Sequence, residues 1–284
     1  MQEVFDQDLS SKIQTAIDHI KSFGGAVVAL SAGVDSSLVA LLAKRALGDR
    51  VVAATGVSKS LAASELVVAG NTAAEIGVRH VTVETDELDD PSYVANVGDR
   101  CYHCKKTLYR ELRGLANSLS YEAILDGTQT DDMRDVRPGL RAASEAGVSS
   151  PLLIAGFTKS DVRKAARLLG LSVWNKPAMP CLSSRIPVGQ EVTVYKLAMV
   201  DEAEAFIKSV VPVTDLRVRH NNGSARIEVN QEERLLFFNE NLMKLINQQF
   251  RRIGFSTVTL DLRGHKGPPS ADPGALILPM STRR

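Results

Sequence analysis

The sequence predicts an α/β protein, in which a doubly wound parallel sheet is followed by a smaller α+β domain. Short unbroken apolar runs, such as residues 25–30, alternate with helical patterns along the first part of the chain. Such runs are typical of strands that are buried on both faces of a parallel sheet. Strands that alternate with helices imply right-handed crossovers, which place helices on both sides of the sheet.

The first domain is expected to span residues 1–187. An amphipathic helix carries apolar residues at helical spacing from Ile13 to Ile20 and ends near Gly24. Strands are then expected at 25–30, 51–57, 80–84, 123–125 and 172–174. Helices are expected at 38–47, 62–76, 105–119 and 159–169. A loop that contains three prolines, residues 175–187, closes the domain.

A second domain, residues 188–263, has a different order of elements. We expect helices at 194–208 and 233–252 and strands at 215–220, 225–229 and 256–262. The first two strands flank Asn221-Asn222-Gly223, and an Asn-Gly pair between alternating residues is a strong hairpin signal because the turn needs positive φ. The tail, residues 264–284, contains several prolines and no periodicity, so we expect a loop or partial disorder there.

Composition narrows the class of function. Lys and Arg number 34 against 33 Asp and Glu, so the net charge is +1 and the strong basic excess of most nucleic-acid-binding proteins is missing. No stretch approaches the roughly 20 apolar residues of a membrane span. Three cysteines in 284 residues argue against a disulfide scaffold and fit the reducing cytoplasm better. Chemistry on a small molecule is therefore favoured.

The loop Ser31-Ala-Gly-Val-Asp-Ser-Ser37 between a strand and a helix is the first candidate site. Backbone N–H groups and the positive end of the helix favour an anion there. Gly33 allows close approach of the backbone, and Ser31, Ser36 and Ser37 add hydroxyl donors. The loop has neither a Walker A ending nor a dinucleotide Gly-x-Gly-x-x-Gly. A phosphate site is expected, although an ordinary Gly/Ser connection has the same local features.

The motif SAGVDSS resembles the SGGxDS signature of the PP-loop ATP pyrophosphatases, which bind ATP, transfer AMP to a substrate oxygen and release pyrophosphate. The resemblance implies an adenine nucleotide alpha hydrolase-like fold and a site for ATP and Mg²⁺. Ala32 replaces the usual glycine, and its methyl group fits if the local dihedrals are ordinary. Asp35 either orients the ion or the loop, or is only a carboxylate in the first turn of a helix.

Further segments resemble the LarE group, ATP-dependent sulfur transferases that build the thiocarboxylate pincer ligand of a nickel cofactor. The segment Asp126-Gly-Thr-Gln-Thr-Asp-Asp132 follows a strand, where open α/β sheets bind ligands, and precedes Arg137-Pro-Gly139. The remaining matches are Arg100-Cys-Tyr-His-Cys-Lys105, Ser150-Pro-Leu152 and residues 176–185, 217–220 and 225–229. The resemblance covers roughly residues 10–263. The predicted ATP contacts beyond the first loop are Asp126, Gly127, Thr128 and Arg137.

Three cysteines form the second candidate site. Cys101 and Cys104 form a C-x-x-C at the start of a helix, and Cys181 lies in the later proline-bounded loop. The residues alone allow inert burial, a zinc site, a [4Fe–4S] cluster, or redox and sacrificial-thiol chemistry. As cluster ligands, three thiolates leave one iron open.

The resemblance favours the cluster. LarE-like proteins with all three cysteines hold a [4Fe–4S] cluster whose open iron carries the sulfide to be transferred. Members with only the equivalent of Cys181 give up its sulfur instead. The resemblance therefore implies that Cys101, Cys104 and Cys181 are metal ligands, and Cys181 is also the candidate catalytic residue.

Cationic side chains are expected to hold the substrate. Arg217 and Arg219 lie at strand spacing, so both project from one face and suit a phosphate or carboxylate. Ion pairs on a solvated sheet face explain the two arginines equally well. Ser184 and Arg185, next to Cys181, either contact substrate or fix their loop.

Other charged residues are weaker candidates. Lys176 and Arg137 rank below the paired arginines as substrate contacts. Glu204 and Glu228 have the chemistry to bind metal, but ordinary helix and strand surface roles are the better expectation.

These signals lead to one hypothesis with two rivals. The hypothesis is a LarE-like enzyme that adenylates each carboxylate of pyridinium-3,5-biscarboxylic acid mononucleotide and converts it to a thiocarboxylate. The resemblance also implies a homo-oligomer, either a trimer or a hexamer, and leaves the sulfide source open. One rival is another PP-loop enzyme, a tRNA thiolase or an amidotransferase synthetase, and near-zero net charge counts against the tRNA alternative. The other rival is a non-catalytic nucleotide sensor on the same fold.

Overall fold

The computed structural model describes residues 7–134 and 138–264. Residue contacts divide the chain into two compact units between Asp201 and Glu202, inside helix α9 (Val194–Val210). The change in the order of the expected elements predicts a boundary near residue 187 instead. Arg137 and the tail from residue 265 onward lie outside the described residues.

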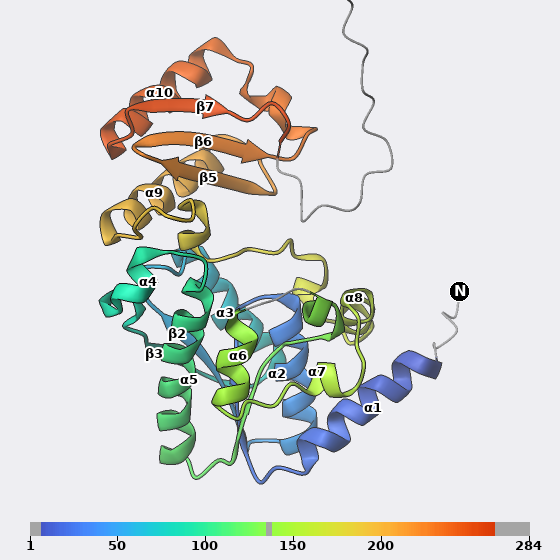
Figure 1. The fold of residues 1–284 in the computed structure, drawn as a ribbon. Helices are drawn as coiled ribbons and strands as arrows, with labels where there is room; N and C mark the ends of the chain where they lie inside the picture. The colour runs from blue at the N-terminus through green and yellow to red at the C-terminus, as the bar shows by residue number, and fades with distance from the viewer. Residues whose placement is uncertain (1–6, 135–137, 265–284) are drawn as a thin grey trace, which may run out of the picture. The chain divides into compact units, whose positions relative to one another are not determined.

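The first unit is built on a four-stranded parallel sheet in the order β3-β2-β1-β4 (Figure 1). Its strands are β1 (Ala26–Ala29), β2 (Val51–Val57), β3 (Arg79–Glu84) and β4 (Ala123–Leu125). The predicted fold class is therefore confirmed. The order reverses between β1 and β4, and in open α/β sheets the carboxyl ends of strands at such a point bind ligands.

Helices connect the strands and cover both faces of the sheet. The α-helices of this unit that precede α9 are α1 (Gln7–Lys21), α2 (Val34–Leu47), α3 (Ala63–Ile76), α4 (Pro91–Ala95), α5 (Arg100–Ser118), α6 (Pro138–Glu145), α7 (Pro151–Ile154) and α8 (Lys159–Leu168). Four 3₁₀-helices join them, η1 (Glu87–Asp89), η2 (Thr130–Arg134), η3 (Ser172–Asn175) and η4 (Leu182–Arg185).

Strand β1 shows why its apolar run is unbroken. Ala26 and Val28 pack into a core formed with α1, α2, α3 and α8, whereas Val27 and Ala29 pack into a second core formed with α5 and α6. Alternate side chains of a strand point to opposite faces, so a sheet covered on both sides needs apolar residues at every position.

The second unit contains a three-stranded sheet in the order β5-β6-β7, made of β5 (Leu216–Asn221), β6 (Ser224–Val229) and β7 (Thr257–Leu260). Strands β5 and β6 are antiparallel and β7 runs parallel to β6. Asn222 and Gly223 have φ values of 47° and 82°, so the predicted hairpin turn is confirmed.

Two predicted elements are wrong. Residues 172–174 are not a strand but part of η3, because a short apolar run with β-branched and aromatic residues does not distinguish a strand from one buried helical turn. The helix expected at 233–252 is divided into η5 (Glu233–Phe237) and α10 (Glu240–Ile253). The side chain of Asn239 accepts a hydrogen bond from the Leu242 N–H at 3.0 Å and begins the second helix.

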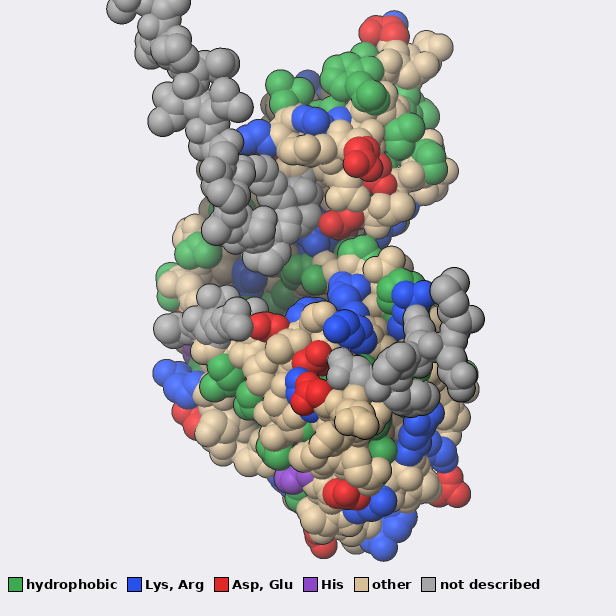
Figure 2. Space-filling model, turned by 90° about the vertical axis from the view of Figure 1, so that its right-hand side faces the viewer, with side chains coloured by type: hydrophobic (Ala, Val, Ile, Leu, Met, Phe, Trp, Pro, Cys, Tyr) green, Lys and Arg blue, Asp and Glu red, His purple; other side chains and the backbone are tan. Residues whose placement is uncertain are grey.

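The second unit also exposes large hydrophobic side chains. They are Leu235, Leu236, Phe238, Met243, Leu245, Leu262 and, on α9, Val210. Figure 2 shows green hydrophobic side chains at the surface of this unit, interrupted by charged ones. Among the described residues, no helix is both long and apolar enough to cross a membrane.

Candidate active site

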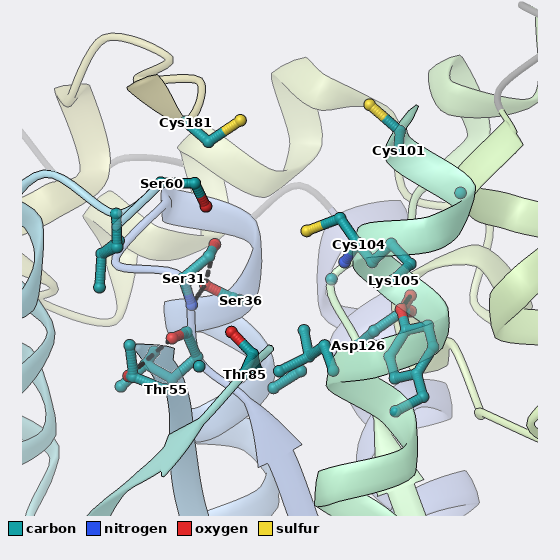
Figure 3. Close-up of a pocket in the computed structure, with 18 of the residues that line it drawn as sticks. Ser31, Ser36, Thr55, Ser60, Thr85, Cys101, Cys104, Lys105, Asp126 and Cys181 are labelled. Carbon is teal, nitrogen blue, oxygen red and sulfur yellow. Dashed lines mark hydrogen bonds between the residues drawn. The ribbon is translucent and has the colours of Figure 1, made fainter. Parts of the chain in front are cut away.

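A cavity of about 720 Å³ opens at the carboxyl ends of the strands of the first unit. The loops after β1, β2 and β4, the first turn of α5 and the loop before η4 all contribute to its wall. The predicted site residues that line it are Ser31, Asp35, Ser36, Cys101, Cys104, Asp126, Gly127, Thr128 and Cys181 (Figure 3). Gly33, Ser37, Ser184 and Arg185 are not part of its lining.

The phosphate loop is closed by its own hydroxyl groups. Ser36 Oγ accepts a hydrogen bond from the Ser31 N–H at 3.1 Å and donates one to the Gly33 carbonyl at 3.1 Å. Ser37 is fully buried and donates to the same carbonyl at 2.8 Å, so its hydroxyl holds the loop rather than facing the cavity. The N-cap residue of α2 is Gly33, which has no side chain that could cap the helix. The first N–H groups of the helix are therefore left for an anion.

Ala32 has a left-handed backbone, with φ of 59°, and its side chain is fully buried. The condition of ordinary dihedrals, under which alanine was expected to fit, is therefore not met. The turn has the geometry that favours glycine, and alanine adopts it at a cost of about 1–2 kcal/mol. Lys176 Nζ donates to the Ala32 carbonyl at 3.0 Å and to Glu65 Oε2 at 2.7 Å, so the strained peptide group is held from outside the loop.

Asp35 is paired with a lysine that the sequence analysis missed. Lys159 Nζ, at the start of α8, lies 2.5 Å from Asp35 Oδ2. The other oxygen, Asp35 Oδ1, is buried and has no hydrogen-bond partner among the described residues. A carboxylate oxygen that is left without a donor beside a phosphate loop is a suitable ligand for Mg²⁺.

Asp126 organises the loop after β4. Its carboxylate accepts hydrogen bonds from Tyr109 Oη at 3.1 Å, Thr128 Oγ1 at 2.8 Å and Ser150 Oγ at 2.7 Å. With its oxygens already used in this way, Asp126 shapes the loop more than it presents a free ligand. Gly127 allows the loop to approach α2, because an added Cβ would lie 2.7 Å from the Ser36 backbone nitrogen.

Lys105 is the one basic side chain among the described residues that line the cavity. Burial alone would lower its pKa, but the nearby Tyr109 and Asp126 raise it above the ordinary lysine value. Its ammonium group lies 5.3 Å from the centre of the Tyr109 ring. Lys105 therefore keeps a positive charge in a cavity whose acidic lining residues are Asp35, Glu87, Asp126 and Asp132.

The three cysteines face the same space from two sides (Figure 3). Helix α5 begins at Arg100 rather than at about residue 105, so Cys101 and Cys104 are the second and fifth residues of the helix, at the i, i+3 spacing of one helix face. Burial and the Glu87 carboxylate raise the pKa of the Cys104 thiol to about 12. Across residues 7–134 and 138–264, no three Cys, His, Asp or Glu are grouped closely enough to hold a metal ion.

The loop that carries Cys181 is fixed by a buried arginine. Arg185 is 1% exposed, and its Nη1 donates to the Pro180 carbonyl at 2.5 Å, to the Cys181 carbonyl at 3.2 Å and to Ser184 Oγ at 3.0 Å. The Leu182 N–H also donates to the Ser60 carbonyl at 2.8 Å. These contacts support the loop-fixing alternative for Arg185, and a contact between Ser184 and substrate stays a prediction.

In the second unit, both predicted substrate arginines contact carboxylates. Arg217 donates to Asp215, and Arg219 Nε donates to Glu228 Oε2 at 2.9 Å. Glu204 Oε1 accepts from the Val218 N–H at 2.9 Å, which gives this buried carboxylate a structural role. Substrate binding by the two arginines stays a prediction.

The sequence analysis missed Lys159, Lys105 and Glu87 as site residues. Lys105 lies within a quoted motif, and Glu87 follows closely after β3, so each carried a positional signal. Lys159 carried none, because its pairing with Asp35 joins residues 124 positions apart.

The sequence of this chain is similar to the sequences of several known proteins. The family model for asparagine synthase matches residues 8–111. An uncharacterised Synechocystis protein, slr1717, is 42% identical over 258 residues, which cover 89% of this chain and 96% of that protein. The pyridinium-3,5-bisthiocarboxylic acid mononucleotide synthase of Lactiplantibacillus plantarum is 38% identical over 262 residues, 91% of this chain and 93% of that protein. A component of the glutamine-hydrolysing GMP synthase of Thermococcus kodakarensis is 24% identical over 206 residues, 68% of this chain and 67% of that protein.

The parallel sheet, the phosphate loop after β1 and the asparagine synthase match define a PP-loop ATP pyrophosphatase. The Lactiplantibacillus plantarum relative narrows that class, because its similarity extends over nearly all of both chains. The chain belongs to the LarE family and is an ATP-dependent sulfurtransferase.

Proposed function

We propose that this enzyme converts both carboxylates of pyridinium-3,5-biscarboxylic acid mononucleotide to thiocarboxylates, one after the other. The observation that carries the proposal is that the phosphate loop and three cysteines open into one cavity. The name of the Lactiplantibacillus plantarum relative, a synthase of the bisthiocarboxylic acid mononucleotide, supports this choice of substrate.

The phosphate loop performs the activation step. The N–H groups at the start of α2 and the Ser31 hydroxyl bind phosphate oxygens. Within the described part of the chain, an added Cβ at Gly33 would meet only Ser31 Oγ, at 3.4 Å, so there is open space beside the loop. Asp35 Oδ1, which has no hydrogen-bond partner among the described residues, would hold Mg²⁺, and the ion would neutralise phosphate charge. A substrate carboxylate oxygen attacks the α-phosphorus, the bond to the bridging oxygen breaks, and pyrophosphate leaves with that electron pair.

The cysteines hold the sulfur source. Three thiols that line one cavity suit a [4Fe–4S] cluster, whose ligands bind separate irons and need not converge on a single ion. When bound, the cluster supplies an iron that holds sulfide. That sulfide would be the nucleophile for the carbonyl carbon of the acyl adenylate, and AMP would be the leaving group as the carbon–oxygen bond breaks.

Other features of the chain support further parts of the proposal. Arg217 and Arg219 are proposed to bind the anionic groups of the substrate. The exposed hydrophobic side chains of the second unit suit the burial that a trimer or hexamer would provide. The cytoplasm remains the expected location, because free cysteines persist in a reducing compartment.

The test of substrate and reaction uses the full chain with Mg²⁺-ATP and either the pyridinium dicarboxylate mononucleotide or tRNA. AMP and pyrophosphate are expected only with the mononucleotide, together with a thiocarboxylate product in the mass spectrum. Products formed only with tRNA would identify a tRNA thiolase. ATP bound without AMP formation would identify a nucleotide sensor.

The sulfur source is tested on anaerobically reconstituted protein. About four irons per chain and broad iron–sulfur absorbance are expected, and each of Cys101→Ser, Cys104→Ser and Cys181→Ser should lose both. A colourless, iron-free protein that forms product and loses the elements of H₂S from Cys181 would replace the cluster by sacrifice of that cysteine.

A further inference from the structure

Glu87 is a buried carboxylate in the wall of the cavity that the reaction steps above do not use. It begins η1, just after β3, and is 1% exposed. One of its oxygens, Oε1, accepts hydrogen bonds from Ser58 Oγ at 2.5 Å and from Ser60 Oγ at 2.7 Å. Two hydroxyl groups from the loop after β2 therefore fix the orientation of the carboxylate.

The second oxygen of Glu87 is left unsatisfied. Oε2 is buried and has no hydrogen-bond partner in the part of the chain that the structure describes. A buried polar atom in this state costs about 1–3 kcal/mol, and more when it carries charge. A bound group is expected to satisfy this oxygen.

The surroundings of Glu87 indicate a cationic group. Glu87 and Cys104 both line the cavity. Cys101 and Cys181 line the same cavity. The basic residue in the described lining, Lys105, already interacts with Tyr109 and Asp126. A bound cation would supply positive charge for Glu87, and the thiols in the same cavity favour iron.

We propose that Glu87 Oε2 is the resting ligand of the iron that the three cysteines leave open, and that hydrosulfide displaces it when sulfur is loaded. The inference rests on the cluster of the proposed function. In the exchange one iron–oxygen bond breaks, its electron pair stays on the carboxylate, and one iron–sulfur bond forms with the electron pair of hydrosulfide. No oxidation state changes, and Ser58 and Ser60 still hold the released carboxylate through Oε1.

Glu87→Gln tests the proposal with little change of shape. The amide oxygen still accepts the two serine hydrogen bonds, whereas the NH₂ group at the position of Oε2 has no lone pair for iron. Glu87→Ala is a second variant that removes both groups. Asp89→Asn is the matched control, because Asp89 lies on the same 3₁₀-helix and is exposed.

Full-length wild type and variants are reconstituted anaerobically with ⁵⁷Fe and compared by Mössbauer spectroscopy and by titration with hydrosulfide. In the wild type, one of the four irons should have a spectrum typical of oxygen ligation. That spectrum should change in Glu87→Gln and Glu87→Ala and stay unchanged in Asp89→Asn. If the carboxylate occupies the iron about nine-tenths of the time, removing it tightens hydrosulfide binding by about tenfold.

Two results would overturn the proposal. Wild type and both Glu87 variants with the same spectrum and the same hydrosulfide affinity would show that Glu87 is not a ligand, while the cluster itself would stand. An iron-free wild type would remove the cluster and this ligand together, and AMP formation with the mononucleotide would then still decide the activation step separately.

Discussion

Ala32 shows how a single residue sets the shape of the phosphate loop. Its φ of 59° lies where side chains are disfavoured, yet its methyl group is fully buried. The loop tolerates this because Ser36, Ser37 and Lys176 hold the neighbouring groups by hydrogen bonds. Backbone strain of this kind persists only where the surrounding structure determines the conformation.

Ala32→Gly should be neutral or slightly stabilising, within about 1 kcal/mol in the free energy of unfolding. Relief of the left-handed strain offsets the loss of a buried methyl group. Ala40→Gly, in the buried interior of α2, is the matched control and should lose about 1–2 kcal/mol. Urea unfolding measures both, and a loss above about 1 kcal/mol in Ala32→Gly would contradict the strain argument.

Lys159→Met should slow pyrophosphate release by roughly 10- to 100-fold at saturating ATP, because a charged hydrogen-bond donor beside the phosphates is worth about 1.5–3 kcal/mol. Lys159 Nζ donates to Asp35 Oδ2, and we expect bound phosphates to compete for this donor. Lys12→Met removes a different ion pair of α8, the one to Asp161 at 3.0 Å, and should leave the rate unchanged. Equal rates in the two variants would exclude a role for Lys159.

At the scale of elements, the loops after β1 and β4 form one site because a glycine lets them touch. Gly127→Ala would place a Cβ 2.7 Å from the Ser36 backbone nitrogen and 2.9 Å from the Asp35 carbonyl carbon. Because backbone atoms cannot rotate away as a side chain can, we expect the loop after β4 to move away from the loop after β1. We expect a loss of about 1–3 kcal/mol in stability and of at least about tenfold in ATP affinity.

Gly114→Ala provides the control for that substitution. Gly114 is an exposed residue in the middle of α5, and an added Cβ there would meet no atom within 4 Å among the described residues. Stability should rise by up to about 1 kcal/mol with unchanged ATP binding, which isothermal titration calorimetry measures in both variants. Weaker ATP binding in Gly114→Ala would mean that the assay reports general destabilisation.

The elements that could be predicted are those whose signal is local. Burial of every residue of β1 produces an apolar run, and positive φ at Asn222 and Gly223 requires the residues found there. Residues 172–174 show the limit, because one apolar helical turn has the same composition as a short strand. The break before α10 depends on the capping bond of Asn239, which a continuous amphipathic pattern conceals.

At the scale of the whole molecule, the free energy of unfolding of the second unit should depend on pH in the acidic range. Although burial opposes it, hydrogen bonds from Arg226 and Arg219 lower the pKa of Glu228 below its ordinary value of 4.5. A lowered pKa in the folded state means that the charged carboxylate stabilises the fold above about pH 4.5. This contribution is lost as the pH falls further.

Glu228→Gln should therefore cost roughly 2 kcal/mol at pH about 7, between the values for exposed and buried ion pairs. The difference from wild type should shrink as the pH drops below about 4.5, which urea unfolding at several pH values measures. Glu240→Gln, in the exposed pair with Lys244 on α10, should change stability by less than about 0.5 kcal/mol. A difference for Glu228→Gln that stays constant with pH would contradict the assigned ion pairs.

The structure brings predicted site residues together where strand order determines their position. The loops after β1 and β4 follow neighbouring strands whose carboxyl ends meet at the switch point, so their polar residues line one cavity. The contacts that were missed join distant segments, such as Asp35 with Lys159, 124 residues apart, or Glu87 with Ser58. Such pairs follow from how helices and loops pack on the sheet, which no local pattern encodes.

Lys176 links the phosphate loop to the loop that carries Cys181. Its ammonium group holds the carbonyl of Ala32 in the phosphate loop, and its backbone belongs to the same loop as Cys181. A movement of the Ala32 peptide group would therefore reach the segment that carries Cys181 through one side chain.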